Sequence, residues 1–406
     1  MKILILYIAS IFGMVNTDPK NEIKISDVMS VQDMPSGNAY YTSDHLGNTV
    51  LCWTAGEKEN SFLYYSIYNS KLGTFGNQDK VIPSKGTNMH GESMNKIAFK
   101  KDGTLVAVYE RKHPTETNRF AGSIFYAQSF DQGKTWTKEK YLHTDTLQEF
   151  GHSYFDVATL PDGEVCAVWL DGRNQRGKDG SSLYFSKTKN KEGFQTDKEI
   201  GETVCQCCRT DLYVDQNETL HVLYRDIDNG LKGQIRDFVH ATTTDNGNTF
   251  SSAKKISEDN WVIAGCPHTG ASMCGDNSKI GIVWYTAGGV PGLYYTSSKL
   301  KENNFHPRQL LSEAAHHPQL TTWGKETALV WEEAGKEAEH DHNGGMHNES
   351  KGTIVFTVLD DASKIETKAV VDSSGGEFPA LASVSAQEML VAYTKDGQVW
   401  VKKVSR

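Results

Sequence analysis

Residues 94–111 read MNKIAFKKDGTLVAVYER, which is a short strand-like run, an Asp-Gly pair and an apolar run ending in an aromatic residue. Alternating apolar and polar residues on both sides of Asp-Gly predict a β-hairpin, because the tight turn between two strands favours glycine and aspartate. The same phrase returns along the chain, so this hairpin is one unit of a repeat.

Seven copies of the hairpin can be aligned, and their starts lie roughly 50 to 60 residues apart, a period typical of propeller blades. The copies start at Ala39, Met94, Tyr154, Arg209, Thr269, Pro318 and Pro379. A third strand-like segment follows most copies, such as SIFYAQSF after the second, and four strands per unit indicate a β-propeller. Residues 22–30 (EIKISDVMS) supply the strand that the last copy lacks. We therefore predict an all-β propeller of seven four-stranded blades, closed by the N-terminal strand.

The bulk composition narrows the class of protein. The chain of 406 residues has a formal net charge of -9 without a basic stripe, which excludes nucleic acid as a partner. Residues 1–17 begin with MKILILYIASIFGMV, a lysine followed by a short apolar run, which predicts a signal peptide and a secreted or periplasmic protein. We expect residues 18–406 to form a single propeller domain without a transmembrane segment.

Two segments share a turn pattern at equivalent places in the repeat. SFDQGKTW spans Ser129 to Trp136, and TTDNGNTF spans Thr243 to Phe250. In such a turn the aspartate accepts backbone N–H bonds, the glycine adopts positive φ, and the aromatic residue packs against the blade. We expect Asp131 and Asp245 to be structural.

These segments make the chain resemble the sialidase superfamily, also called the BNR or Asp-box repeat proteins. The resemblance covers nearly the whole repeat region and implies a propeller that acts on glycans or binds them. It suggests a glycoside hydrolase of exo-sialidase type or a lyase of acidic polysaccharides. Sialidases have six blades, which leaves six as the alternative count. They also share an Arg-Ile-Pro motif near the start, which is absent here because the first arginine is Arg111.

Residues that precede the first strand of each repeat converge on one face, because that strand is innermost in a propeller. Histidine or cysteine recurs at this place, and both are ligands of zinc and copper. The predicted metal ligands are His90, His152, Cys205, Cys207, Cys208, Cys266, His268 and His317. We expect the four histidines to point toward one another around the axis. A disulfide among the cysteines, or polar packing of a narrow channel, are the alternatives.

The second strands of the repeats end on the same face in charged residues. Arginines and carboxylates there favour binding of an acidic saccharide and acid–base chemistry, although salt bridges between loops would produce the same pattern. The candidates for binding substrate are Arg111, Arg173, Arg209 and Arg225. The candidate acids and bases are Glu110, Asp171 and Asp226, and for a lyase His152 and Tyr154.

An insertion in the sixth repeat, EAEHDHNGGMHNES, is rich in residues that bind metals. It contains His340, His342, Met346 and His347, and is interpreted as either a polar loop or a metal-collecting lid. Three functions therefore remain open: a glycan-active enzyme, a zinc- or copper-binding propeller, and a binding scaffold without catalysis.

Overall fold

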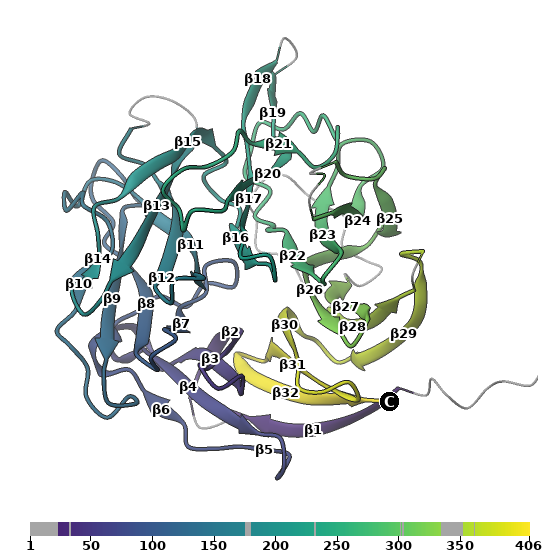
Figure 1. Cartoon of the computed structure of the whole chain (residues 1–406), viewed down its shortest axis with the longest axis horizontal. Coiled ribbons are helices and arrows are strands. Elements are labelled where there is room, and N and C mark those ends of the chain that lie inside the picture. Colours follow the sequence, from purple (N-terminus) through teal and green to yellow (C-terminus); the bar gives the residue numbers. More distant parts are fainter. Residues whose placement is uncertain are drawn as a thin grey trace, which may run out of the picture.

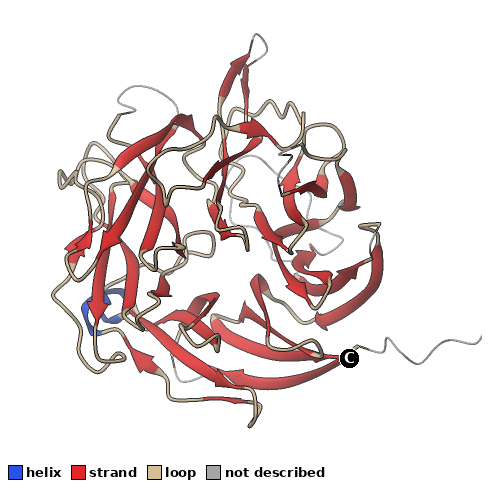
Figure 2. Ribbon diagram, in the orientation of Figure 1, coloured by secondary structure: helices blue, strands red, loops and turns tan. Residues whose placement is uncertain are grey.

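The computed structural model of the protein is a ring of β-sheets around a central axis (Figure 1). It describes residues 23–31, 34–174, 180–230, 233–300, 302, 304–333, 352–360 and 362–406. Within these residues, seven antiparallel sheets of four or more strands form the blades. In the described part of the chain, helix is limited to short turns such as Lys58–Asn60 and Ile82–Ser84, and strands dominate Figure 2.

The first four blades take up the chain from Ser36 to Lys255. Blade 1 has β2 (Ser36–Ser43), β3 (Thr49–Ala55), β4 (Phe62–Asn69), β5 (Thr74–Phe75) and β6 (Asp79–Lys80). Blade 2 has β7 (Lys96–Phe99), β8 (Leu105–Lys112), β9 (Gly122–Ser129) and β10 (Lys140–Tyr141). Blade 3 has β11 (His152–Thr159), β12 (Val165–Asp171), β13 (Ser181–Lys189), β14 (Gly193–Phe194) and β15 (Lys198–Val204). Blade 4 has β16 (Asp211–Val214), β17 (Leu220–Arg225), β20 (Phe238–Thr243) and β21 (Lys254–Lys255).

The remaining blades follow the same order. Blade 5 has β22 (Ser272–Gly275), β23 (Lys279–Thr286), β24 (Gly292–Lys299) and β25 (Gln309–Ser312). Blade 6 has β26 (Ala315–Trp323), β27 (Glu326–Glu333), β28 (Thr353–Leu359) and β29 (Ile365–Asp372). Blade 7 has β30 (Glu377–Ser383), β31 (Glu388–Lys395), β32 (Gln398–Ser405) and β1 (Lys24–Ser30). A separate hairpin, β18 (Asp228–Gly230) and β19 (Gly233–Ile235), extends from blade 4.

The two ends of the described chain close the ring. Strand β1 pairs antiparallel with β32, from Lys24 opposite Ser405 to Ser30 opposite Trp400. Figure 1 shows this pairing as the purple strand lying along the yellow one. The predicted seven blades and the closure by the N-terminal strand are confirmed, and the six-blade alternative is wrong.

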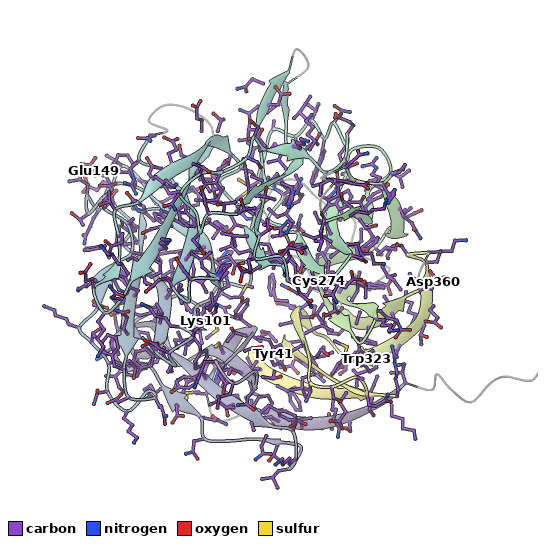
Figure 3. The ribbon with its side chains drawn as sticks, in the orientation of Figure 1. Tyr41, Lys101, Glu149, Cys274, Trp323 and Asp360 are labelled. Carbon is purple, nitrogen blue, oxygen red and sulfur yellow. The ribbon has the colours of Figure 1, made fainter. Side chains whose placement is uncertain are left out.

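One aromatic residue recurs at the same register of each second strand. These residues are Trp53, Tyr109, Trp169, Tyr224, Trp284, Trp331 and Tyr393. All seven are buried, and burial of one such side chain contributes roughly 1.5–3 kcal/mol. This repeated anchor fixes the register of the inner hairpins. Side chains fill the blades from Tyr41 and Cys274 near the axis to Glu149 and Asp360 at the rim (Figure 3).

Four inner strands begin with the same irregularity. The register of β2, β11, β26 and β30 shifts around one residue with positive φ, a geometry typical of a β-bulge. These residues are Asn38 (φ 59°), Tyr154 (52°), His317 (48°) and Phe378 (48°). Bulky side chains rarely adopt this conformation, which costs of order 1–3 kcal/mol. The bulges therefore mark the mouth of the axis, on the face where the residues before the inner strands were expected to converge.

Two residues after this position, polar side chains join neighbouring blades. The Asp156 carboxylate accepts the backbone N–H of Leu212 at 2.7 Å, and the Asp211 carboxylate accepts that of Met273 at 2.6 Å. In the next blade the Ser272 hydroxyl plays the same role. Inner strands are sheet edges with free N–H groups, and these bonds satisfy them.

The two Asp-box segments form the turns that the sequence predicts. Asp131 accepts the Thr135 N–H at 2.8 Å and the Ser129 hydroxyl at 2.9 Å. Asp245 accepts the Thr249 N–H at 2.9 Å in the same way. These bonds lower the pKa of both aspartates, as expected for structural carboxylates.

Some predictions fall outside the described residues. They are the signal peptide at residues 1–17 and the insertion residues His340, His342, Met346 and His347. Among the described residues, no helix is long and apolar enough to span a bilayer.

Candidate functional site at the mouth of the axis

A loop of blade 2, residues 88–93, lies at the mouth of the axis; we call it the axial loop. Its Glu92 accepts hydrogen bonds from Arg209 Nη1 of blade 4 at 3.1 Å and from Gly270 N of blade 5 at 2.6 Å. A Cβ at Gly91 would lie 2.4 Å from the ring of Phe378 in blade 7, so only glycine fits beneath this ring. The axial loop thus links blades on several sides of the ring.

Arg209, one of the predicted substrate-binding residues, has its guanidinium in contact with protein groups. Its side chain is buried, and besides Glu92 it donates to the carbonyl oxygens of Ala271 at 3.3 Å and Pro318 at 3.2 Å. Arg209 therefore acts as a staple that joins blade 4 to blades 5 and 6.

The other three predicted substrate arginines also bind protein groups. Arg111 pairs with Glu139 at 2.8 Å, and Arg173 pairs with both Asp171 at 2.6 Å and Asp197 at 2.7 Å. Both arginines therefore form salt bridges of the kind that the alternative interpretation describes.

Arg225 is held between elements that are far apart in sequence. It donates to the carbonyl oxygens of Arg236 at 2.8 Å and Tyr285 at 3.0 Å, and its guanidinium lies over the Phe238 ring. Because the side chain is buried, it does not reach solvent.

Two of the three predicted carboxylic acids are buried. Glu110 accepts the Ser93 hydroxyl at 2.6 Å and the Asn88 amide at 3.1 Å, so it anchors both ends of the axial loop. Asp171 is fully buried and accepts from Trp169 Nε1 at 2.9 Å as well as from Arg173. Asp226 keeps partial exposure, and its burial raises the pKa of the carboxyl.

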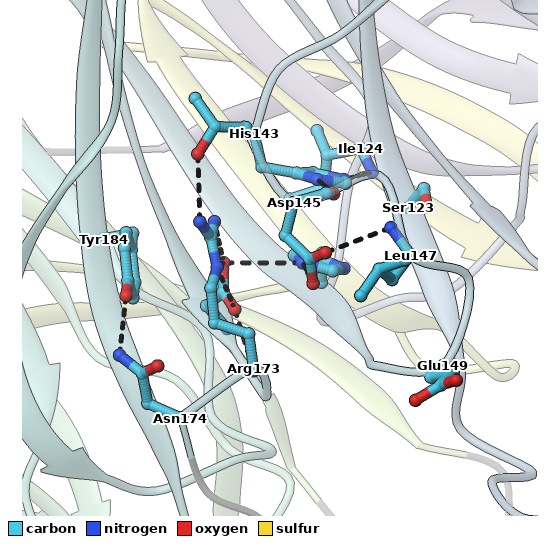
Figure 4. A network of polar contacts seen from close by, with 12 residues as sticks. Ser123, Ile124, His143, Asp145, Leu147, Glu149, Arg173, Asn174 and Tyr184 are labelled. Atoms are coloured by element: carbon cyan, nitrogen blue, oxygen red, sulfur yellow. Dashed lines mark hydrogen bonds and ion pairs between the residues drawn. The ribbon is translucent and has the colours of Figure 1, made fainter.

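His152 lies buried in the interior between blades 2 and 3, and not around the axis where the sequence pattern predicts it. Its Nδ1 donates to the Gly122 carbonyl at 3.0 Å, and its ring stacks on His143 with centroids 3.7 Å apart. The surrounding network of Asp145 and Arg173 is drawn in Figure 4. Burial, followed by the nearby charge of His152, lowers the pKa of His143 to about 3. No sequence pattern indicated His143.

His90 and Tyr154 meet at the edge of the axial loop. Their rings are in edge-to-face contact with centroids 5.7 Å apart, and the Tyr154 N–H donates to the Ser93 hydroxyl at 3.0 Å. Burial and the charge of Lys112 lower the pKa of His90, whereas burial raises the pKa of Tyr154. A neutral imidazole therefore lies beside a protonated phenol at neutral pH.

His317 sits on the opposite side of the mouth. Its Nδ1 is 2.8 Å from Glu332 Oε2, and its ring packs on Phe378 with centroids 4.3 Å apart. Burial lowers the pKa of His317, but the hydrogen bond to Glu332 and the negative charges of Glu92 and Glu332 together raise it above its ordinary value. The ring of His316 also lies near it, with centroids 6.2 Å apart.

Four cysteines gather where blades 4 and 5 meet. The Sγ atom of Cys205 lies 3.6 Å from those of Cys207 and Cys208, beyond the length of a disulfide bond of about 2.05 Å. All seven cysteines are free thiols, so the disulfide alternative is not formed. The Cys207 hydrogen bond, opposed by burial and assisted by Arg236, lowers the pKa of Cys266 to about 7.

Two groups among the described residues bring three potential metal ligands within 4.8 Å of one another. One is Cys205, Cys207 and Cys208, and the other is Cys207, Cys266 and His268. His90, His152 and His317 belong to neither group. The predicted site of four histidines is therefore not assembled, and the thiols with His268 are the part that comes together.

The repeated hairpins, the closed ring and the Asp-box turns define a seven-bladed propeller of the sialidase-like class. The chain belongs to the BNR repeat-like domain family, whose sequence pattern matches residues 47–262. No curated protein matches the sequence.

Solved structures share this fold at low sequence identity. A protein of unknown function from Dyadobacter fermentans DSM 18053 aligns with a TM-score of 0.52 and 12% identity, covering 94% of this chain and 98% of that chain. An ulvan lyase, described as a polysaccharide lyase of a new family, aligns with a TM-score of 0.55 and 11% identity over 92% and 95%. The same kind of lyase bound to -[GlcA(1-4)Rha3S]- gives 0.55 and 10% over 93% and 95%. At these identities the likeness concerns the fold.

Proposed function

We propose that the protein is a lyase that cleaves acidic polysaccharides at the mouth of the axis. The observation that carries the proposal is the contact between His90 and Tyr154, a neutral imidazole against a protonated phenol. Membership of the BNR family and the fold shared with a polysaccharide lyase support a glycan substrate. Fold alone does not determine the reaction, so the residues must carry the argument.

The chemistry is a β-elimination across the glycosidic bond of a uronate. His90 takes the proton from the carbon next to the carboxylate, and the C–H electron pair forms a carbon–carbon double bond. The bond from the neighbouring carbon to the glycosidic oxygen breaks, and that oxygen receives a proton from Tyr154. A lowered pKa suits His90 to the role of base, and a raised pKa keeps the proton on Tyr154 until the transfer.

The uronate carboxylate needs a positive charge while its neighbouring carbon loses a proton. Lys112 is exposed, and its charge acts on His90, so it is the cation we assign to this role. Positioned charge of this kind stabilises the developing anion.

A sialidase-type hydrolase fits the residues less well. Such an enzyme grips its substrate with arginines, and the predicted arginines at this face are bound to protein carboxylates and carbonyls. Export, which the sequence of residues 1–17 supports, would bring the protein to extracellular polymers.

The test is turnover on a panel of uronate polysaccharides, including ulvan. A lyase produces an unsaturated uronate whose double bond absorbs ultraviolet light, whereas a hydrolase releases new reducing ends without this absorbance. We expect Tyr154→Phe to reduce turnover by about 100-fold or more while the melting temperature is unchanged. Tyr64→Phe, which removes a hydroxyl from a half-buried tyrosine of blade 1, is the matched control. Absence of the double bond on every polymer, or full activity of Tyr154→Phe, contradicts the proposal.

A further inference from the structure

We infer that the junction of blades 4 and 5 is a binding site for one thiophilic transition-metal ion, zinc(II) or copper(I). Its ligands are the thiolates of Cys207 and Cys266 and the imidazole of His268, whose ligand atoms all lie within 4.8 Å of one another. This site goes beyond the proposed lyase activity and does not depend on it.

The donor set selects the class of ion. Two sulfurs and one nitrogen suit zinc and copper(I), whereas calcium and magnesium require oxygen ligands. Metal–sulfur bonds of about 2.3 Å place two tetrahedral sulfur ligands nearly 4 Å apart, which the spacing of this group allows. Cys266 and His268 are exposed, so the fourth coordination position faces solvent.

Both loops that carry the ligands are already fixed by the axial loop. Glu92 binds Arg209 with one carboxylate oxygen and Gly270 with the other. These partners follow Cys207 and His268 by two residues each, so one buried carboxylate holds the two halves of the site in place. The site therefore needs little rearrangement when an ion binds, which favours affinity.

The surroundings support the sulfur ligands. Gln206 Nε2 lies 3.5 Å from Cys266 Sγ, and its amide oxygen accepts from Arg236 Nη1 at 3.3 Å. Arg236 also lies 3.4 Å from Cys205 Sγ, so a fixed cation stands beside the sulfur cluster. Groups behind the ligands commonly orient them and tune affinity in this way.

His268 adopts a φ of 49°, a strained conformation for a histidine. Such strain persists where the surrounding structure holds it and is concentrated at binding sites. The backbone conformation of His268 is therefore in keeping with a binding site.

The experiment measures metal rather than turnover. Reduced full-length protein is freed of metal with a chelator and titrated with Zn²⁺, with Cu⁺ held in a competing ligand, and with Co²⁺ as a spectroscopic probe. We expect one ion per chain and the intense ultraviolet bands of cobalt–thiolate bonds. The ion that binds with the higher affinity, Zn²⁺ or Cu⁺, is assigned as the metal of the site.

Variants locate the ion. Cys266→Ser and His268→Ala change exposed side chains and are expected to weaken binding by about 100-fold or more without lowering the melting temperature. Gln206→Ala should weaken it by about 10-fold, as expected for a group behind a ligand. Cys274→Ala, at a buried thiol of β22 outside both groups, is the matched control and should bind normally.

Three results would overturn the inference. They are no binding by the reduced protein, binding that survives Cys266→Ser, and a disulfide in the isolated protein whose reduction restores no metal binding. A thiol titration of the unfolded protein detects the disulfide, because it would find two fewer than the seven free thiols.

Discussion

The Glu92 carboxylate and the Arg209 guanidinium form a buried ion pair, with Oε1 and Nη1 3.1 Å apart, although blade 3 separates their two blades. Contacts between neighbouring blades are expected in any propeller. This pair instead joins blade 2 to blade 4, which are not neighbours in the ring. The same carboxylate holds the Gly270 N–H at 2.6 Å. A polar bridge through Glu92 therefore joins blades 2, 4 and 5 at the mouth of the axis.

We predict that Glu92→Gln lowers the free energy of unfolding by about 3–5 kcal/mol, because it leaves the Arg209 charge buried without a counter-ion. Denaturant unfolding measures the effect. Glu302→Gln is the control, because its exposed pair with Lys299 contributes little. Equal stability of the Glu92 variant and the wild type would show that the bridge is not structural.

The Asp-box glycines pack against aromatic residues of the preceding blade. A Cβ at Gly133, where φ is 85°, would lie 2.0 Å from the Tyr65 hydroxyl, and one at Gly247 would lie 2.2 Å from the Phe185 ring. We predict that Gly133→Ala lowers the melting temperature strongly, because it adds a clash to the cost of positive φ. Gly47→Ala, at φ 82° with open space around it, should show the conformational cost alone.

A double variant separates clash from conformation at this turn. Removing the hydroxyl in Tyr65→Phe leaves Cζ as the nearest atom, 3.3 Å from the added Cβ. The double variant should therefore recover part of the stability that Gly133→Ala loses. If it recovers nothing, steric contact with Tyr65 is not the cause.

The blades could be predicted well from the sequence because the repeat carries its own register. An aromatic residue lies near the end of each second strand, from Trp53 to Tyr393, and its burial decides which face of the hairpin packs inward. Residues that precede inner strands of adjacent blades had to meet, and Cys207 does lie beside Cys266 and His268.

The roles of charged residues could not be read from the same pattern. A charged side chain at the end of a strand can face solvent or bind another protein group, and the sequence pattern is the same in both cases. Arg225 binds the carbonyl oxygen of Tyr285, which is 60 residues away in sequence. His152 begins the inner strand β11, but the segment that contains His143 and Asp145 covers its ring in the interior between blades 2 and 3. The contacts of Glu92 with Arg209 and Gly270 form only because the closed ring brings blades 2, 4 and 5 together at the axis.

The stacked pair His143 and His152 makes stability depend on pH. The pKa of His143 is about 3 in the folded protein, lowered first by burial, whereas an unfolded histidine titrates near 6.5. The unfolded state therefore binds an extra proton between these values. The stabilising effect is complete above about pH 6.5 and is lost as the pH falls toward 3.

We predict that His143→Gln reduces the slope of unfolding free energy against pH by about 1.4 kcal/mol per pH unit between pH 6 and 4. Glutamine retains an acceptor for the Ile124 N–H, which now donates to His143 Nε2 at 3.2 Å. Chemical unfolding at several pH values measures the slope. An unchanged slope would mean that His143 is charged in the folded state.

Closure of the ring by β1 gives the last prediction. Without this strand, the outer edge of β32 loses its partner, and Ile25 no longer packs on the core of blades 6 and 7. An uncovered edge pairs readily with other chains. We predict that a variant beginning at Met34 melts at a lower temperature and forms oligomers, whereas one beginning at Ile23 behaves like the full chain. Thermal unfolding and size-exclusion chromatography measure the two effects. A synthetic peptide of residues 23–31 should restore the melting temperature of the shorter variant, because it can occupy the edge of β32 in the register from Lys24 opposite Ser405. If the shorter variant is a monomer as stable as the full chain, β1 does not hold the ring closed.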